Sequence, residues 1–236
     1  MKKIIYSLMA VLAISAFTAC DNGNTELGGT INLPPQISFG EYGVFFDNRD
    51  GAINVTVQDG VEGSELTTIT SITYQIVAFD GTEQSNGTVP GSDNLVEATI
   101  AIAAGSLSPN ATDEPYSLIV TSNDSAGESS TETAEFNVFR GFNTIGIIGD
   151  ATPGGWGADT DMTDVGDGVY EVTIDLAALS AKFRADDAWD VAWGSTDFPS
   201  GTGDSTPGSP NIPIAEAGTY KVTFDSKDSS YNFEKQ

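Results

Sequence analysis

The chain has 236 residues and a formal net charge of −25 at pH 7, since 34 acidic side chains stand against nine basic ones. It contains no histidine and a single cysteine, which excludes serine–histidine–aspartate and cysteine–histidine catalysis, the common zinc sites and a disulfide framework. The charge opposes binding to nucleic acid and to anionic membrane surfaces, whereas it permits a neutral ligand or a divalent cation.

Residues 1–19 are typical of an export signal peptide. Lys2 and Lys3 give it a positive start, and the apolar run that follows is too short to span a membrane as a helix. Cys20 follows small residues at the expected cleavage point. This arrangement resembles a bacterial lipoprotein signal, which implies that Cys20 becomes a lipid anchor and that residues 20–33 form a flexible tether. An ordinary secretory signal with an incidental thiol is the alternative.

Residues 34–140 are predicted to form a first β-sandwich. Segments of alternating apolar and polar residues are separated by turn-forming pairs such as Asp-Gly, Asn-Gly and Pro-Gly. The predicted strands are residues 52–57, 69–79, 96–103, 116–122 and 132–139. Residues 115–138 resemble the final hairpin of a bacterial immunoglobulin-like or fibronectin-like domain, which implies an antiparallel sandwich and no particular function.

Residues 143–236 are predicted to form a second all-β domain after the short join at 140–142. The predicted strands are residues 144–148, 169–176, 181–185, 219–224 and 231–234. The sequence after the signal has no convincing helical periodicity, so we expect an all-β protein with two antiparallel β-sandwiches. All three tryptophans lie in this second part.

The segment 182–194 concentrates charged and aromatic residues of the kind that hold a sugar. Lys182 and Arg184 alternate with Phe183, so the two cations would share one strand face while Phe183 enters the core. Like charges on one face need acids or a ligand between them. The nearest acids in the sequence are Asp186, Asp187 and Asp190. A solvated ion-pair face is the alternative to a ligand site.

The tryptophans are the candidate sugar platforms. Trp189 and Trp193 would share a face if 189–193 is extended, although one of them could equally be buried. Trp156 lies between glycines in a predicted loop at 153–157, which suits a core poorly, so we expect it to be exposed. Covering roughly 100 Å² of apolar area with a sugar face would contribute about 2.5 kcal/mol before ordering costs.

The acidic stretch 159–168 does not fit a calcium-binding EF-hand loop. Thr163 and Asp164 stand at the fifth and sixth positions, where that loop needs an aspartate or asparagine and a glycine. We therefore predict an acidic loop that leads into a strand, with no metal site and no cofactor.

Six short motifs carry a family resemblance. They are residues 147–156, 167–171, 182–186, 189–194, 211–214 and 217–224. Together they resemble the carbohydrate-binding module of the SusE/SusF-type outer-membrane starch-binding lipoproteins of Bacteroidota. The resemblance implies a non-catalytic, lipid-anchored protein that holds starch-like α-glucan or a related polysaccharide at the cell surface, beside a TonB-dependent importer and its lid lipoprotein.

The same resemblance implies which side chains contact the glycan. They are Trp156, Lys182 and one or both of Trp189 and Trp193, with Arg184 as a further candidate. The chain carries one such module, whereas the named members of the family carry two or three. Weak binding at a single site then depends on many copies at one surface for its avidity.

Two other functions stay open at this point. A lipid-anchored spacer or adhesion lipoprotein would bury its tryptophans and bind no small ligand. A glycoside hydrolase would need two carboxylates that flank a scissile bond, and the sequence specifies no such pair. The residues themselves therefore favour a binding protein over an enzyme, and the resemblance implies that it is anchored in the outer membrane and faces the cell surface.

Overall fold

The computed structural model describes residues 32–59 and 67–236. The predictions for the signal peptide, for Cys20 and for most of the tether lie outside these residues. The described residues form strands and turns without any helix, and hence without a helix long and apolar enough to cross a membrane. The expected all-β fold class is confirmed.

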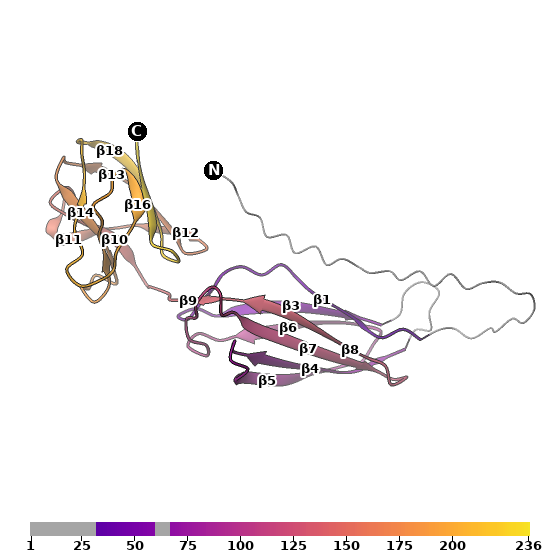
Figure 1. Ribbon diagram of the computed structural model, residues 1–236. Helices are drawn as coiled ribbons and strands as arrows, with labels where there is room; N and C mark the ends of the chain where they lie inside the picture. The colour runs from indigo at the N-terminus through magenta and orange to yellow at the C-terminus, as the bar shows by residue number, and fades with distance from the viewer. Residues whose placement is uncertain (1–31, 60–66) are drawn as a thin grey trace, which may run out of the picture. The chain divides into compact units, whose positions relative to one another are not determined.

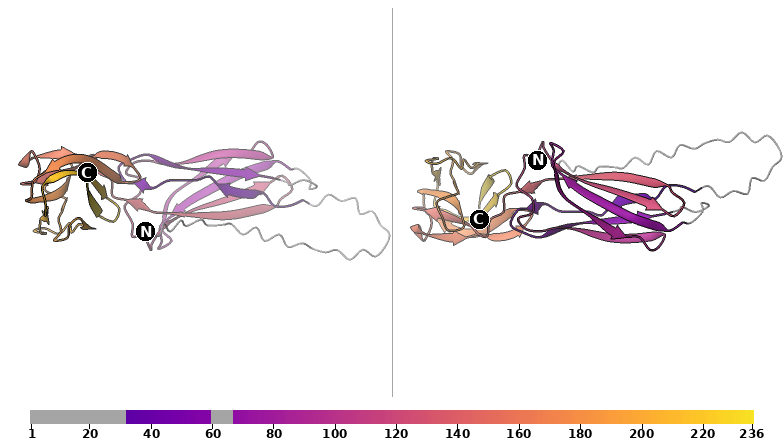
Figure 2. Two further views of the ribbon diagram at one scale, coloured as in Figure 1. Left: turned by 90° about the horizontal axis from the view of Figure 1, so that it is seen from above. Right: turned by 90° about the horizontal axis from the view of Figure 1, so that it is seen from below.

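Residues 34–59 and 67–140, which we call the first sandwich, form two antiparallel sheets that face each other (Figures 1 and 2). One sheet, in spatial order β1-β3-β6, consists of β1 (Gln36–Phe39), β3 (Gly51–Gln58) and β6 (Leu95–Ile102). The other, in spatial order β5-β4-β7-β8, consists of β4 (Ile69–Val77), β5 (Glu83–Pro90), β7 (Tyr116–Asp124) and β8 (Ser129–Phe136). A short parallel pair joins β2 (Phe45–Phe46) to β9 (Val138–Phe139).

The core of the first sandwich follows from strand alternation. Every second residue of β3 and of β7 is buried, as expected for strands with one face inside. The inward residues of β3 and β7 include Ile53, Val55, Val57, Leu118 and Val120. These side chains come from opposite sheets and belong to one hydrophobic cluster, so the cluster holds the two sheets together.

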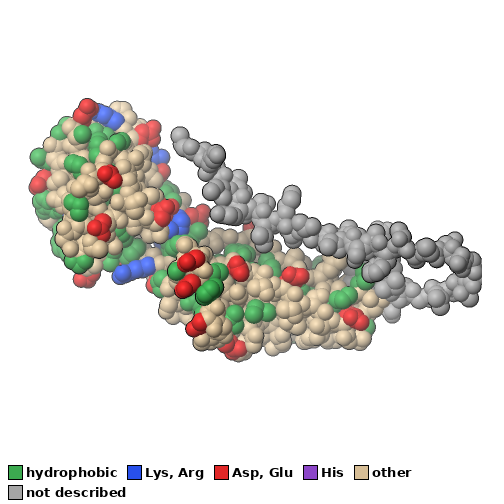
Figure 3. Space-filling view, viewed as in Figure 1, with side chains coloured by type: hydrophobic (Ala, Val, Ile, Leu, Met, Phe, Trp, Pro, Cys, Tyr) green, Lys and Arg blue, Asp and Glu red, His purple; other side chains and the backbone are tan. Residues whose placement is uncertain are grey.

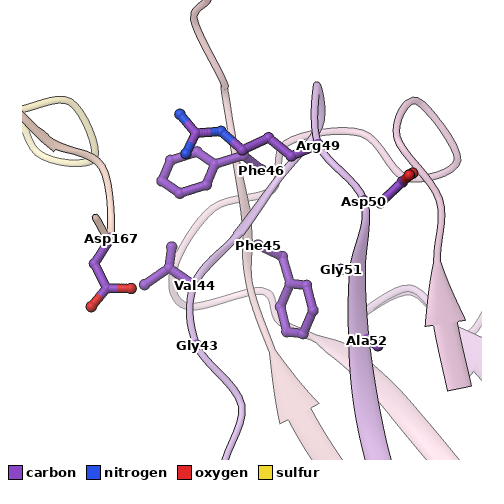
Figure 4. Close-up of a pocket in the computed structure, with 9 residues that line it drawn as sticks. All are labelled: Gly43, Val44, Phe45, Phe46, Arg49, Asp50, Gly51, Ala52 and Asp167. Carbon is purple, nitrogen blue, oxygen red and sulfur yellow. The ribbon is translucent and has the colours of Figure 1, made fainter. Parts of the chain in front are cut away.

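Aromatic side chains of β2 pack at one end of this sandwich (Figure 4). Phe45 lies beside Gly51, where a Cβ atom would come within 2.5 Å of the Phe45 ring, so β3 needs a glycine at this point. The guanidinium of Arg49 lies 4.7 Å from the centre of the Phe46 ring, in a cation–π arrangement. The hollow of about 210 Å³ around these residues is thus lined by side chains already engaged in packing.

Residues 143–236, the second sandwich, also form two antiparallel sheets. The first, in spatial order β11-β10-β14-β15 with β17 paired to β14, consists of β10 (Ile145–Gly149), β11 (Gly155–Asp161), β14 (Ser180–Ala185), β15 (Ala192–Trp193) and β17 (Ile212–Pro213). The other, in spatial order β12-β13-β18-β19-β16, consists of β12 (Thr163–Gly166), β13 (Val169–Leu176), β16 (Ser200–Thr202), β18 (Gly218–Asp225) and β19 (Ser230–Lys235).

Phe183 lies at the centre of the second core. It is fully buried and stacks on Phe224 with ring centres 4.6 Å apart. The buried cluster around it runs from Phe142 to Phe233, whereas the cluster of the first sandwich runs from Phe45 to Val138. Within the described residues the two clusters share no member, so the chain has separate hydrophobic cores on either side of the predicted join.

The structure corrects one local prediction and decides a question that the sequence left open. The sequence predicts a loop at 153–157, but β11 begins at Gly155 and includes Trp156. The sequence left open whether 189–193 is extended; the chain turns before β15, and only the last two of these residues are in a strand. Asp186 and Asp187 both have a φ of 52°, which reverses the chain directly after β14.

Candidate functional site

Two exposed indole rings lie beside each other in the second sandwich. Trp156 of β11 is 37% exposed, and Trp189, in the turn after β14, is 56% exposed. Their ring centres are 6.1 Å apart and their planes are inclined by 38°. We call these two rings the indole pair. Their mutual tilt gives an angled aromatic surface in place of a flat one.

An irregular strand pairing presents Trp156 to the outside. Thr160 pairs with Ile147 of β10, but the next pair joins Gly155 to Gly149, so the register shifts between them. Ile147 faces the core, and Gly149, two residues later, shares its side. The shift therefore gives the inward position to Gly155, and Trp156 points outward.

Arg184 supports Trp189 from within the fold. Its guanidinium carbon lies 4.6 Å from the centre of the Trp189 ring. Its Nε donates a hydrogen bond to Asp159 Oδ2 at 2.9 Å. Arg184 is only 8% exposed, so the cation is enclosed between a carboxylate and an indole face.

The Asp159–Arg184 ion pair crosses β10 at Gly146. Gly146 pairs with Arg184 of β14 on one side and with Asp161 of β11 on the other. A Cβ atom on Gly146 would lie 2.8 Å from Asp159 Cβ, so the glycine leaves the space through which the pair meets. Burial raises the pKa of Asp159, the Arg184 guanidinium acts against that rise, and the Asp187 carboxyl adds to it.

Lys182 lines a pocket of about 220 Å³ next to Trp189. Its Nζ donates hydrogen bonds to the carbonyl oxygen and to Oγ of Ser209, at 2.6 and 2.7 Å. Burial lowers the pKa of Lys182, and the Asp204 carboxylate partly offsets this. An ammonium group has three donors. The two contacts with Ser209 among the described residues account for two of them.

The loop 205–209 and the side chain of Asp190 also line this pocket. The loop is held against β15 by a pair of backbone hydrogen bonds between Gly194 and Asp204, at 3.0 and 2.7 Å. A Cβ atom on Gly194 would overlap the carbonyl oxygen of Pro210 and lie 2.8 Å from Lys182 Nζ. The close approach that forms the pocket therefore requires a glycine there.

The alternation predicted for β14 is confirmed. Phe183 is in the core, and Lys182 and Arg184 lie on the other face. The acid that pairs with Arg184 is Asp159 on β11, and not one of the nearby acids of the following turn. Asp186 instead accepts backbone hydrogen bonds from residues 143 and 144 and so fixes the turn.

The structure contradicts Trp193 as a ligand contact. Trp193 is 4% exposed and packs edge-on against Phe142, with ring centres 5.3 Å apart. Because the chain turns after β14, Trp189 and Trp193 do not share a strand face. The sequence left open which of the two tryptophans is exposed. In the structure Trp189 is at the surface and Trp193 belongs to the core.

Three residues that shape this region were not predicted from the sequence: Asp159, Gly146 and Ser209. Asp159 belongs to the acidic stretch 159–168, which does not fit an EF-hand loop, and no local sequence pattern links it to Arg184. Ser209 lies in a Ser-, Thr-, Gly- and Pro-rich stretch without periodicity. The one available signal for Asp159 was Arg184 itself. A cation on a strand needs an acidic partner on a neighbouring strand of the sheet.

Acidic side chains outnumber basic ones on the face that Figure 3 shows. Because the chain has so few basic residues, it is unusual that two of them, Lys182 and Arg184, lie on the same face of β14 and are largely buried. In the described ranges, no group of three or more histidine, cysteine, aspartate or glutamate side chains is arranged to hold a metal ion. Exposed indole faces with an ammonium and a carboxylate beside them suit a ligand that has both apolar faces and hydroxyl groups.

Comparisons with known proteins give only weak likenesses. No family model and no curated protein matches the chain. A β-glucuronidase of Parabacteroides merdae is 16% identical over 46% of this chain and 13% of its own, with a TM-score of 0.32. β-Glucuronidase 3 of Bacteroides uniformis is 12% identical over 54% of this chain and 17% of its own, with a TM-score of 0.29.

The sporulation control protein Spo0M of Bacillus subtilis is 8% identical over 80% of this chain and 78% of its own, with a TM-score of 0.30. The chain thus spans less than a fifth of the length of either glucuronidase. At this level of similarity, the likenesses identify neither a fold family nor an activity.

Proposed function

We propose that the second sandwich binds a neutral polysaccharide, with α-glucan favoured, on the indole pair and in the pocket of Lys182. The observation that carries the proposal is the exposure of two adjacent indole rings, one of which rests on a buried ion pair. Large aromatic side chains in a small domain are usually buried. Two that are exposed together, with one ring supported from below, indicate a surface kept for a ligand.

The geometry suits a chain of sugar rings. The C–H face of one ring would lie on each indole, and the tilt between the indoles fits a curved chain, such as an α-glucan, better than a flat one. The Lys182 ammonium would donate to a sugar hydroxyl, and the Asp190 carboxylate would accept from one. Each indole contact contributes about 2.5 kcal/mol for roughly 100 Å², so we expect dissociation constants in the micromolar-to-millimolar range, about 10⁻⁶ to 10⁻³ M.

The rest of the proposal rests on the sequence resemblance. The protein would be a non-catalytic lipoprotein, held by a lipid on Cys20 in the outer membrane and facing the cell surface. There it would retain polysaccharide beside a TonB-dependent importer and its lid lipoprotein. Many copies on one membrane would compensate for the weakness of a single site.

Native affinity gels that contain soluble polysaccharides test the binding. We expect a neutral α-glucan to retard the wild-type protein, and both Trp156→Ala and Trp189→Ala to abolish the retardation. Phe79→Ala is the matched control, because Phe79 is an exposed aromatic of the first sandwich. Its loss should leave the mobility in the glucan gel unchanged.

Unchanged wild-type mobility across a panel of neutral polysaccharides would overturn the proposal. A lipid-anchored structural or adhesion protein without a small ligand would then be the better description. Release of reducing sugar from any member of the panel would instead show that the protein is an enzyme.

A further inference from the structure

A group of buried polar side chains gathers at one end of the first sandwich. Asp59 directly follows β3, Thr67 precedes β4 and Asp124 ends β7. Antiparallel pairing of Ile69 with Asp124 brings the last two together. Asn32, which precedes β1, lies at the same end because β1 pairs with β3 from its first residue.

One hydroxyl group connects the two carboxylates. Thr67 Oγ1 contacts Asp59 Oδ2 and also lies 3.0 Å from Asp124 Oδ2. The Thr67 backbone N–H donates to Asp59 Oδ2 at 2.8 Å. The amide nitrogen of Asn32 donates to Asp124 Oδ2 at 2.9 Å. We call these four residues the Asp59–Asp124 cluster.

The cluster has more acceptors than hydrogens. A threonine hydroxyl carries one hydrogen, so Thr67 Oγ1 can donate to only one of the two carboxylates that it contacts. Asp59 is 0% exposed, and its Oδ1 has no hydrogen-bond partner. The buried Oδ1 of Asn32 has none either. Buried oxygens without a donor are rare and costly, and they call for an ion or a proton.

Basic side chains do not supply the missing charge. In the part of the chain that the structure describes, the ion pairs of lysine and arginine involve acids other than Asp59 and Asp124.

We propose that the Asp59–Asp124 cluster binds a calcium ion. Calcium prefers oxygen ligands from carboxylates and neutral oxygens, six to eight in number, often with water among them. Both carboxylates, the Asn32 amide oxygen and the Thr67 hydroxyl offer such ligands, and water would complete the set. Zinc and other softer metals fit less well, because the cluster contains no nitrogen or sulfur donor free to bind them.

A calcium ion here would have a structural consequence. It would join the segment before β1 to the ends of β3, β4 and β7, in addition to the hydrogen bonds that Thr67 and Asn32 make there. The bound ion would thus fix the end of the first sandwich at which the described chain begins. This site is independent of the indole pair, so its test does not depend on glycan binding.

Calorimetric titration of the chelator-treated full chain with calcium chloride tests the proposal. We expect one ion per chain, with a dissociation constant of about 10⁻⁴ M, the range typical of calcium sites in extracellular modules. Asp59→Asn should weaken binding at least tenfold, by about 1.4 kcal/mol. Asp113→Asn, which changes an exposed acid of the same sandwich, should leave it unchanged. Calcium should also raise the melting temperature relative to chelator.

The proposal fails if the wild type shows neither binding heat nor a melting shift with calcium. It also fails if Asp59→Asn and Asp113→Asn weaken binding equally, since calcium would then be responding to overall charge. If the protein without calcium becomes more stable on mild acidification while calcium has no effect, a shared proton holds the cluster together and the site is refuted. Should Asp59→Asn not fold, Asn32→Ala removes one ligand and is expected to weaken binding severalfold.

Discussion

Arg184 lies beneath Trp189 and, at 8% exposure, is too enclosed for the direct sugar contact that the resemblance implied. Its guanidinium is in contact with Trp189 on one side and with Asp159 on the other. The side chain of Asp159 is 2% exposed, so its charge is compensated almost wholly by this one cation. The position of Trp189, and with it the shape of the candidate platform, therefore depends on a buried ion pair.

Arg184→Ala should be strongly destabilising, because it leaves the Asp159 carboxylate buried and unpaired. Loss of one partner of a buried pair costs about 3–5 kcal/mol. Urea unfolding followed by tryptophan fluorescence measures the change, since all three tryptophans lie in the second sandwich. Lys221→Ala is the control: it removes the more exposed pair with Glu171 and should cost no more than about 1 kcal/mol. Equal losses in the two variants would contradict this account of Arg184.

The alternation of residues in the sequence correctly predicted that Lys182 and Arg184 share a strand face, but it could not identify the residues with which they pair. The position of a side chain on a strand face depends only on the local period of two. The contact between Arg184 and Asp159 depends on the order of β14, β10 and β11 in the sheet and on the missing side chain of Gly146, which no local pattern reveals. The same limit explains Trp193, whose burial follows from a chain reversal at two aspartates with positive φ.

Long strands with an apolar face were predictable from sequence, whereas short strands such as β2 and largely exposed ones were not. The predicted strands of both sandwiches coincide with β3, β4, β6, β7, β8, β10, β13, β14, β18 and β19 to within a few residues. By contrast, β5 and β12 lack an apolar face and are largely exposed. They are strands because neighbouring strands supply their hydrogen-bond partners, which is a property of the assembled sheet and not of their own residues.

The turn between β7 and β8 should make the first sandwich sensitive to acid. Asp124 Oδ1 accepts hydrogen bonds from the backbone N–H groups of residues 126 and 128, at 2.9 and 2.8 Å. The pKa of Asp124 is lower in the folded chain than its usual value. A group of this kind stabilises the fold at pH values above its unfolded pKa, about 3.9, and that stability disappears as the pH falls through the folded pKa.

We therefore expect the first sandwich to lose stability below about pH 4, and Asp124→Asn to show a shallower dependence on pH over the same interval. Urea unfolding by far-ultraviolet circular dichroism between about pH 3 and 7 measures this, with chelator present so that calcium does not contribute. Asp113→Asn, in an exposed turn, should keep the wild-type dependence. A curve for Asp124→Asn that runs parallel to the wild-type curve would count against the role of the turn.

The charge of the whole chain would limit which polysaccharides the proposed site could hold. The net charge is −25, and the cations nearest the indole pair are already engaged, Arg184 by Asp159 and Lys182 by Ser209. A polyanionic glycan would meet a repulsive field, because the net charge of the chain is strongly negative. A neutral glycan would feel only the indole faces and hydrogen bonds, neither of which depends strongly on salt.

Salt dependence of the affinity-gel retardation separates these cases. Raising sodium chloride from about 10 mM to 0.5 M shortens the screening length from roughly 30 Å to a few ångströms. Retardation by a neutral α-glucan should then change less than about twofold, because no counterions are displaced when indole faces cover sugar rings. Polygalacturonate should retard the protein at neither salt concentration. Strong retention by polygalacturonate at low salt that vanishes at high salt would show that a cationic surface, and not the indole pair, determines binding.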